Sequence, residues 1–229
     1  LKFKTFKNQV SFSKEDIFQE LYKENQDRIR IKKEKTAVKN LSKIFDAALS
    51  ISNEKGFSAM SLRDLSSEAG LSMGALYSYI SSKDDLLDML LQQGRTAVFR
   101  VLVQQIQGID SPKDRLKMAV QTHLYVSEIM QPWFYFQYME TKNFRKEEHK
   151  KAIESELFTE NIFQEIVAQG IEAGQFRPVD VALTSAAIKA MLQDWYLKRW
   201  KYERRNVSVE DYAGFLMEVL GSYLHAENT

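Results

Sequence analysis

The sequence predicts an all-α fold, and three observations support this prediction. Apolar residues recur at the three- and four-residue spacing of a helix along most of the chain, while alternating strand patterns are scarce. Only 3 prolines and 9 glycines interrupt the 229 residues. The hydrophobic content of 44% is enough to bury a core, so we expect a folded helical protein.

The first 35 residues form a basic extension that we expect to be partly helical. A tail over Leu1–Phe12 precedes a helix that begins with an N-cap at Ser13 and extends to about Arg30. Basic residues are concentrated at the end of this extension: Arg28, Arg30, Lys32, Lys33 and Lys35. Two interpretations stay open: an arm that contacts the backbone or minor groove of a nucleic acid, and a charged segment exposed to solvent.

A longer amphipathic helix is predicted next. Its apolar stripe consists of Val38, Leu41, Ile44, Phe45, Ala48, Leu49 and Ile51. Gly56 stands where a glycine commonly ends a helix. A helix of this kind can serve as the scaffold for the short elements that follow.

Two short helices joined by a turn follow the scaffold helix. Ser61 is the expected N-cap of the first, and Gly70 supplies the unusual backbone angle of the turn. Ser72 is the expected N-cap of the second, Met73–Tyr79. Two short helices with a glycine-containing turn are the helix-turn-helix pattern, which presents its second helix to a groove of DNA.

The helix-turn-helix and its flanks carry a dense set of signature residues. They are Gly56-Phe57, Ser61-Leu62-Arg63-Asp64-Leu65, Ala69-Gly70-Leu71-Ser72-Met73-Gly74-Ala75-Leu76-Tyr77-Ser78-Tyr79 and Ser82-Lys83-Asp84-Asp85-Leu86-Leu87. This set, within about Val38–Val98, resembles the DNA-binding domain of the TetR/AcrR family of transcriptional regulators. The resemblance implies a sequence-specific DNA-binding regulator with an N-terminal three-helix DNA-binding domain and a C-terminal helical domain for ligand binding and dimerisation.

The resemblance also implies which residues meet DNA. They are Ser61, Arg63, Ser72, Met73, Gly74, Ala75, Tyr77, Tyr79 and Lys83. Of these, Ser61, both tyrosines and the lysine would contact phosphates, whereas the residues after Ser72 form the exposed edge of the recognition helix. Met73 and Ala75 offer little hydrogen-bonding chemistry, so base reading would depend on Arg63, thymine methyl groups and DNA shape. Core packing is the alternative for the tyrosines, although Tyr77 at least should be exposed.

Helical patterns continue to the end of the chain. We expect a long helix from a cap at Ser82 to about Ile106, then a linker at Gly108–Pro112. Further helices are predicted from Pro112 to about Met130, from Glu147 to about Ala173, over Val181–Arg204, and after a cap at Ser208. The expected organisation is an extension at 1–35, a DNA-binding domain at 36–98 and a ligand-sensing and dimerisation domain at 99–229.

The resemblance implies a pocket for a small-molecule effector among the middle helices. An unusually aromatic stretch follows Pro132, and methionine and aromatic side chains suit an apolar ligand. The candidate lining residues are His123, Tyr125, Met130, Trp133, Phe134, Phe136, Tyr138, Met139 and Met191. A fatty acyl or acyl-CoA ligand ranks ahead of an aromatic drug-like compound, and ordinary core packing is the alternative for any single residue.

A palindromic operator requires a two-fold dimer, because its half-sites lie about 34–36 Å apart per helical turn. The last two long helices are the best candidates for the interface, since the first of them carries small residues that permit close approach. The interface candidates are Ala186, Ala190, Trp195, Tyr212, Phe215, Leu216 and Val219. We therefore expect three partners: double-stranded operator DNA, a second copy of the chain and a small-molecule effector.

Several functional classes are disfavoured by the composition. The absence of cysteine excludes disulfides, thiolate metal sites and cysteine nucleophiles, and 3 scattered histidines build no metal site. No glycine-rich phosphate loop is present, so we expect no enzyme, no cofactor and no metal. No apolar run approaches the roughly 20 residues of a membrane span, so we expect a cytoplasmic protein without a membrane partner. The net charge of +1 by itself indicates no polyanion partner.

The expected function is that of a repressor that a small apolar ligand releases from its operator. Two alternatives to this function stay open. A TetR-like activator would carry the same motif, because the sequence does not encode the outcome at the promoter. A helical interaction protein that does not bind DNA would explain the helices, but it would not explain the combination of Tyr77, Tyr79 and Lys83.

Overall fold

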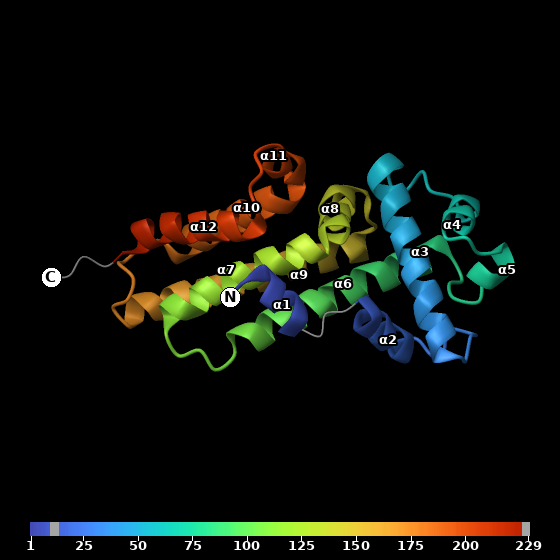
Figure 1. Cartoon of the computed structure of the whole chain (residues 1–229), viewed down its shortest axis with the longest axis horizontal. Helices are drawn as coiled ribbons and strands as arrows, with labels where there is room; N and C mark the ends of the chain where they lie inside the picture. The colour runs from blue at the N-terminus through green and yellow to red at the C-terminus, as the bar shows by residue number, and fades with distance from the viewer. Residues whose placement is uncertain (10–13, 226–229) are drawn as a thin grey trace. The chain divides into compact units, whose positions relative to one another are not determined.

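The structure is a computed structural model that describes residues 1–9 and 14–225 (Figure 1). Its contacts divide the chain into two compact units. The HTH unit comprises Lys7–Ala97 and Tyr135–His149, and the bundle unit comprises Leu1–Phe6, Val98–Phe134 and Lys150–Thr229. The described residues form helices joined by turns, with one isolated bridge between Phe176 and His225, which confirms the all-α prediction.

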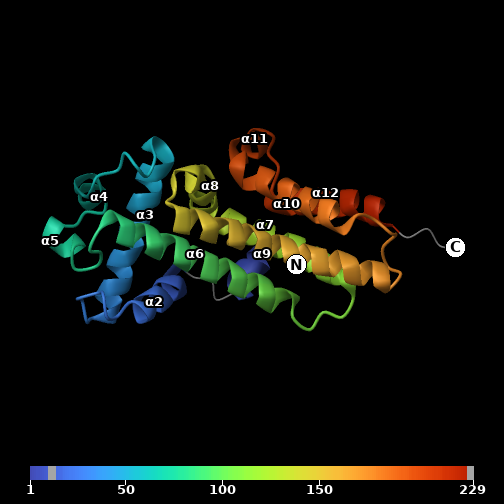
Figure 2. The same cartoon turned by 180° about the vertical axis from the view of Figure 1, so that it is seen from behind.

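The HTH unit is built around one central helix. Its elements are α2 (Lys14–Glu24), α3 (Glu34–Lys55), α4 (Leu62–Glu68), α5 (Met73–Leu76), the part of α6 (Lys83–Ile106) up to Ala97, the part of α8 (Gln131–Glu140) from Tyr135, and the 3-10 helix η1 (Thr141–Asn143). Figures 1 and 2 show α2 beside α3, and α3 buries Leu41, Ile44 and Ala48 completely. These positions follow the helical spacing of the predicted stripe, so the stripe faces the core.

Most of the predicted helix ends of the HTH unit are confirmed. Gly56 has a φ of 87°, and its N–H donates to Ser52 O at 2.8 Å. A φ in this range favours glycine, which explains why α3 ends there. Ser82 Oγ accepts from Asp85 N at 3.1 Å at the start of α6. The cap expected at Ser13 lies outside the described residues.

The bundle unit consists of long helices around α7 (Figure 2). Its further elements are the start of α1 (Phe3–Gln9), the end of α6, α7 (Pro112–Ile129), the start of α8, α9 (Lys146–Glu172) from Lys150, α10 (Val181–Leu197), α11 (Arg199–Arg204) and α12 (Val209–Leu224). Helix α7 packs against α10 and α12. It is buried on nearly every side from Thr122 to Ser127, so side chains in this part of α7 face the interior of the unit.

The prediction of a tail over Leu1–Phe12 is wrong for its first part, where α1 begins at Phe3. The rings of Phe3 and Phe6 lie with centroids 5.3 Å from that of Tyr125. Tyr125 Oη donates to Leu1 O at 2.8 Å. These contacts order the start of the chain, and a local sequence pattern does not reveal a partner more than 100 residues away.

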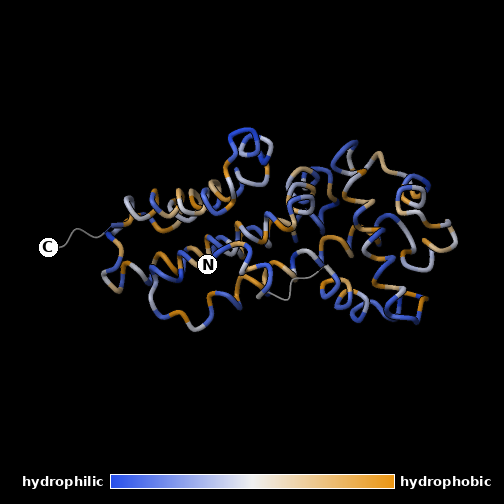
Figure 3. Tube along the Cα trace, viewed as in Figure 1, coloured by the Kyte–Doolittle hydropathy of each residue, from blue (hydrophilic) through white to orange (hydrophobic). Residues whose placement is uncertain are grey.

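The single helix predicted over Val181–Arg204 is two helices. Lys198 breaks it with φ −121° and ψ 36°, and α11 begins at the next residue. Asp194 holds the break, because its carboxylate accepts hydrogen bonds from Lys198, Lys201 and Tyr202. Although burial opposes ionisation, these bonds lower the pKa of Asp194 to about 2. Figure 3 shows the short α11 as a mostly hydrophilic segment.

Candidate nucleic-acid interface

The first short helix, α4, is held at its start by a reciprocal cap. Ser61 Oγ accepts from Asp64 N at 3.1 Å, and Ser61 N donates to Asp64 Oδ2 at 3.0 Å. Lys55 Nζ donates to the same carboxylate at 3.0 Å. The bond from the Ser61 backbone, followed by that from Lys55, lowers the pKa of Asp64 to about 2. The predicted cap is confirmed, and the Ser61 hydroxyl is engaged within the protein.

The turn between α4 and α5 is held by hydrogen bonds on both sides of Gly70. Gly70 has a φ of 63°, which an L side chain rarely adopts. Ser66 Oγ donates to Leu71 O at 2.6 Å, and Leu71 N donates to Ser66 O at 3.0 Å. These two bonds clamp the turn, so α5 is presented at a fixed angle to α4.

The second short helix, α5, ends earlier than predicted, at Leu76 instead of Tyr79. Ser72 Oγ caps it by accepting from Ala75 N at 3.2 Å, and the Leu76 side chain is completely buried. Ser78 Oγ donates back to Gly74 O at 3.1 Å. The α5 edge, defined as Ser72 to Ala75 with Tyr77, therefore turns outward while Leu76 anchors it from beneath.

The two predicted phosphate contacts Tyr77 and Tyr79 have different environments. The Tyr77 side chain is 45% exposed, as expected. Tyr79 is only 2% exposed, its Oη accepts from Asn40 Nδ2 at 2.9 Å, and burial raises its pKa. Tyr79 is thus a core residue that joins α3 to the segment after α5, and we remove it from the set that meets DNA. Core packing, the alternative that the sequence left open for the tyrosines, therefore applies to Tyr79 and not to Tyr77.

Lys83 lies at the start of α6 with its stem packed on the protein. Its Nζ donates to Ser58 O at 2.8 Å and lies 5.0 Å from the centroid of the Phe57 ring. Partial burial lowers its pKa. Lys83 therefore fixes the loop before α4, and its half-buried side chain remains accessible beside that loop.

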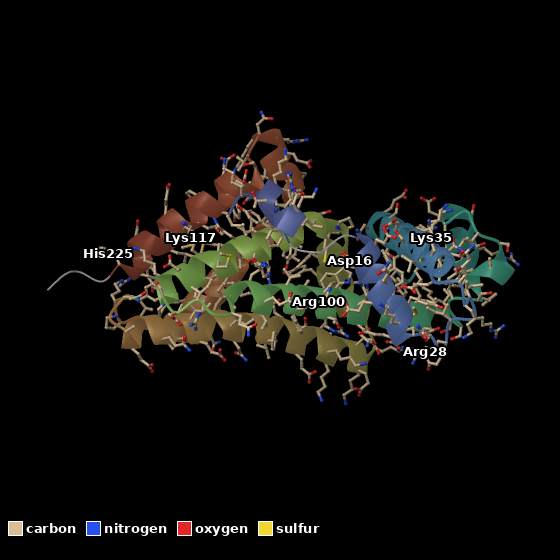
Figure 4. The ribbon with its side chains drawn as sticks, turned by 60° about the horizontal axis from the view of Figure 1, so that its bottom comes forward. Asp16, Arg28, Lys35, Arg100, Lys117 and His225 are labelled. Carbon is tan, nitrogen blue, oxygen red and sulfur yellow. The ribbon has the colours of Figure 1, made fainter. Side chains whose placement is uncertain are left out.

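The basic extension packs on the helix-turn-helix. Phe18 of α2 lies edge-on against Phe45 of α3, with ring centroids 5.2 Å apart. Arg30 N donates to Ser78 O at 2.9 Å, so the extension is bonded directly to the residue that follows the α5 edge. Four basic side chains are exposed just there: Arg30, Lys32, Lys33 and Lys35. Figure 4 labels Arg28 and Lys35, and Arg28 is engaged with Asp85 Oδ1 at 3.3 Å.

The predicted effector pocket is divided between the two units. Within the bundle unit, Phe134 lies 5.7 Å from His123 and 4.9 Å from Tyr196 by ring centroids, and Trp133 lies 5.2 Å from Phe134. We call the cluster of Trp133, Phe134 and Tyr196 the aromatic wall. His123 lies beside it and is not counted as a member. Met130 and Met191 are half-buried in the same unit, and Tyr125 packs on α1 as described above.

Three predicted pocket residues belong to the HTH unit instead. Phe136 is completely buried in its core, with its ring 5.8 Å from that of Phe57. Tyr138 and Met139 are exposed. The prediction that they share a pocket with His123 is therefore not supported by their placement. The helical spacing of α8 sends successive side chains in different directions, which adjacency in the sequence conceals.

The interior of the bundle unit contains polar residues that the sequence analysis missed. Lys189 of α10 is 3% exposed, and its Nζ donates to Thr159 Oγ1 at 2.6 Å. A signal for Lys189 was present, because it lies next to Ile188 and three residues before Leu192 on the apolar stripe. Polar residues on such a stripe should be treated as candidates for a site.

The expected dimer interface separates into buried and exposed residues. Trp195, Tyr212 and Leu216 are buried inside the protomer, and the Trp195 ring stacks on Tyr212 at 5.2 Å. They belong to the core and cannot reach a second chain directly. The exposed interface candidates are Ala186, Ala190, Phe215 and Val219, and Leu183 of α10 and Tyr223 of α12 are exposed as well.

Family models match both parts of the chain. The model of bacterial regulatory proteins of the tetR family matches residues 44–90, and that of the tetracyclin repressor-like C-terminal domain matches residues 109–219. The chain belongs to the TetR family of transcriptional regulators. This membership confirms the resemblance that the helix-turn-helix residues carry, and it confirms that the chain is a regulator and not an enzyme.

Similar proteins agree with this membership. The HTH-type transcriptional regulator HbdR of Aromatoleum sp. (strain CIB) is 26% identical over 162 residues, which cover 71% of each chain. A tetR-family regulatory protein from Rhodococcus RHA1 has the same fold, with a TM-score of 0.73, 20% identity and coverage of 82% of this chain and 98% of that one. AibR in complex with isovaleryl coenzyme A and operator DNA has a TM-score of 0.69, 18% identity and coverage of 81% and 98%.

Two further statements, on metal sites and on membrane-spanning helices, concern only the residues that the structure describes. Among them, no group of histidine, aspartate and glutamate side chains is arranged to hold a metal ion. Over the same ranges, none of the helices has the length and apolar character that crossing a bilayer requires.

Proposed function

We propose that this TetR-family regulator is a dimeric repressor that binds a palindromic operator through the α5 edge and leaves it when a small apolar molecule binds in the bundle unit. The observation that carries the proposal is the α5 edge itself. Its backbone is capped and clamped, its apolar side is buried, and Tyr77 stands free beside exposed basic residues. Such an exposed edge suits a DNA groove.

The α5 edge would read bases mainly by shape. The hydroxyl of Ser72 is engaged by its cap, and that of Ser78 bonds to Gly74 O. Met73 and Ala75 add only apolar surface, which can contact thymine methyl groups. Arg63 on α4 is exposed and is the guanidinium best placed in the motif for a base or a phosphate. Specificity would therefore rest on few direct hydrogen bonds and on DNA deformability.

Phosphate contacts would supply most of the affinity. Tyr77, Lys83 and Arg63 lie on or beside the helix-turn-helix, and the exposed side chains of Arg30 and Lys32 adjoin it through the Arg30–Ser78 bond. Each phosphate that such residues neutralise releases condensed counterions, so binding should weaken steeply with salt. The overall net charge of +1 does not oppose this, because the local arrangement of charge decides.

The exposed apolar side of α10 and α12 supports a homodimer. Leu183 is 71% exposed and Phe215 is 58% exposed. The small side chains of Ala186 and Ala190 are exposed on α10, the helix that carries Leu183. Large apolar side chains on a surface mark interaction sites, and small residues permit close helix packing. A two-fold dimer through this surface would present two α5 edges to successive half-sites.

The effector is proposed to be of acyl type. The aromatic wall supplies apolar surface in the bundle unit, and AibR, which has the same fold, was solved with isovaleryl coenzyme A and operator DNA. Effector binding would favour a dimer state whose two α5 edges no longer match successive major grooves. A ligand can shift this equilibrium only through different affinities for the two states, and coupling of this kind typically amounts to about 1–3 kcal/mol.

Selection from random DNA tests the proposal. The full chain should enrich a palindrome whose half-sites lie about one helical turn apart, and light scattering should report a dimer. Tyr138→Ala, an exposed aromatic residue away from the α5 edge, is the control and should enrich the same palindrome. A set of sequences without symmetry, or no enrichment, would contradict the proposal. Reporter expression that rises instead of falls with the protein would favour the activator.

A further inference from the structure

A lysine ammonium lies inside the bundle unit, where charge is costly. Lysine side chains are almost never fully buried unless they are paired. Lys189 Nζ, on a side chain that is almost entirely inaccessible, donates to Thr159 Oγ1 and lies 3.3 Å from Glu156 Oε2. These contacts join α10 to α9, and α10 also packs against α7.

The carboxylate that faces this ammonium is a weak partner. The Glu156 side chain is 42% exposed, so water screens much of its charge. Its other oxygen, Oε1, accepts from Gln193 Nε2 at 2.8 Å. Burial lowers the pKa of Lys189 despite Glu156, so the present contacts do not fully offset the desolvation of the ammonium.

Three polar atoms on α7 and α10, which pack on each other, lack hydrogen-bond partners among the described residues. His123 Nδ1 and Thr122 Oγ1, on neighbouring residues of α7, are buried and unpaired, and Thr184 Oγ1 on α10 is a third case. By contrast, the buried hydroxyls of Ser127, Thr159 and Ser185 donate to backbone oxygens within their own helix. Since buried polar groups are nearly always paired in native proteins, these atoms are open to hydrogen bonds with a bound molecule.

His123 connects this polar group to the aromatic wall. Burial, followed by the charge of Lys189, lowers the pKa of His123 well below its ordinary value. Its imidazole is therefore neutral near pH 7 and offers one donor and one acceptor. The same ring lies 5.7 Å from Phe134, so polar and apolar surfaces meet at His123.

We propose that the bundle unit binds an apolar carboxylic acid, with its carboxylate paired to Lys189 and hydrogen-bonded by His123 or Thr122 and its apolar part against the aromatic wall. The inference rests on the proposed function and names the chemical class of the effector. A thioester or amide carbonyl is neutral and has no need of a buried ammonium. A carboxylate would replace Glu156 as the partner of Lys189, and Glu156 could turn to solvent.

Calorimetry with a defined panel tests this inference on the full-length dimer. The panel contains straight-chain acids from butanoate to hexadecanoate and the aromatic acids phenylacetate and 3-phenylpropanoate, each beside its primary amide and its coenzyme A thioester. We expect the preferred acid to bind about tenfold tighter than its amide, because hydrogen bonds to charged groups exceed neutral ones. Preference for a straight-chain or an aromatic acid identifies the source of the carboxylate.

Three substitutions assign the effect to residues. Lys189→Met should weaken the preferred acid about tenfold and leave its amide within about twofold. Glu156→Gln should strengthen the acid several-fold, since the competing carboxylate is gone, and it keeps the buried lysine if Lys189→Met folds poorly. Lys117→Met, an exposed lysine on α7 that Figure 4 labels, is the control and should bind like the parent protein.

The outcomes separate the inference from the proposed function. If thioesters or amides bind and release operator DNA while acids do not, the proposed function stands and the inference is overturned. If no compound of the panel binds or changes operator affinity, both the effector part of the proposed function and the inference fail. Acid binding that Lys189→Met and Glu156→Gln leave unchanged also overturns the inference.

Discussion

The helix-turn-helix and the bundle interior treat their polar groups in opposite ways. Around α4 and α5, Ser61, Ser66 and Ser72 each bond to a backbone group within five residues. In the bundle interior, His123 and Thr122 have buried atoms without a partner among the described residues, and the charge of Lys189 acts on His123. The serine hydroxyls of the first region are thus paired without DNA, whereas the unpaired atoms of the second can form hydrogen bonds with a ligand. A preorganised surface suits DNA binding, and an interior with unpaired polar atoms suits ligand binding. The regulator needs both properties, each in its own region.

Removal of the anchor of α5 should have the largest effect. Leu76→Ala deletes a completely buried side chain, so we expect the free energy of unfolding to fall by about 2–5 kcal/mol, and operator binding should be lost. Urea unfolding and fluorescence anisotropy would measure both. Leu157→Ala on α9, an exposed leucine, is the matched control and should change stability by less than about 0.5 kcal/mol. Full operator binding by Leu76→Ala would break the description of α5 as a helix anchored from beneath.

The exposed side of α12 provides the next largest effect. Phe215→Glu places a charge in the proposed interface, and we expect loss of the dimer and a decrease in operator affinity of about 2 kcal/mol or more, which is about thirtyfold. Light scattering and anisotropy would follow assembly and binding. Leu157→Glu, equally an exposed apolar residue, should leave the dimer intact. A dimer that survives Phe215→Glu would place the interface elsewhere.

Tyr77 and Tyr79 allow a comparison of an exposed and a buried hydroxyl within the HTH unit. Tyr77→Phe should weaken operator binding by about 1 kcal/mol, about fivefold, at unchanged stability, because the exposed hydroxyl has no partner in the protomer. Tyr79→Phe should instead lower stability by about 1 kcal/mol, because Asn40 Nδ2 loses its acceptor, and should leave operator affinity nearly unchanged. The reverse pattern in paired unfolding and binding titrations would restore Tyr79 to the DNA contacts.

The basic extension should act on affinity and not on sequence preference. Deletion of residues 1–30 would remove the core side chains Phe18 and Tyr22, so substitution of Arg30, Lys32 and Lys33 by alanine is the cleaner test. The slope of log affinity against log salt should fall by up to about 0.9 for each phosphate that the variant no longer neutralises, equally on specific and random DNA. Lys117→Ala on α7 is the control. An unchanged slope would mean that the extension only packs on α3.

Acid titration should give the smallest effect. Folding lowers the pKa of Asp64 to about 2, below the value near 3.9 of an unfolded aspartate. Its contribution to stability is therefore complete above about pH 4 and is lost as the pH falls towards 2. The difference in unfolding free energy between the parent protein and Asp64→Asn should shrink over that range. A difference that stays constant there would remove the cap carboxylate from the stability of α4.

Local signals made the helix-turn-helix predictable. A cap such as Ser61 or Ser72 bonds within three residues, and Gly70 must adopt a positive φ, so these features can be read from neighbouring residues. The family resemblance then assigned roles to the exposed positions. The fold class and the DNA-binding motif followed from such short-range rules.

Burial and long-range packing were harder to predict. Tyr79 points inward, where it bonds to Asn40 on α3. Phe136 packs in the core against Phe57, which lies almost 80 residues earlier in the sequence. Trp195 and Tyr212 looked like interface anchors, yet they stack on each other inside the protomer. The sequence pattern indicated Lys189, because this residue interrupts an apolar stripe. Its partners on α9 are known only from the structure. Contacts between distant segments decide these cases.

The most direct test of this division of tasks is operator affinity with and without the preferred acid, measured for two variants beside the parent protein. We expect Tyr77→Phe to weaken operator binding about fivefold and to keep the full release by the acid. We expect Lys189→Met to bind the operator within about twofold of the parent protein and to lose the release. If either substitution changed both properties to the same degree, the two regions would not have separate tasks.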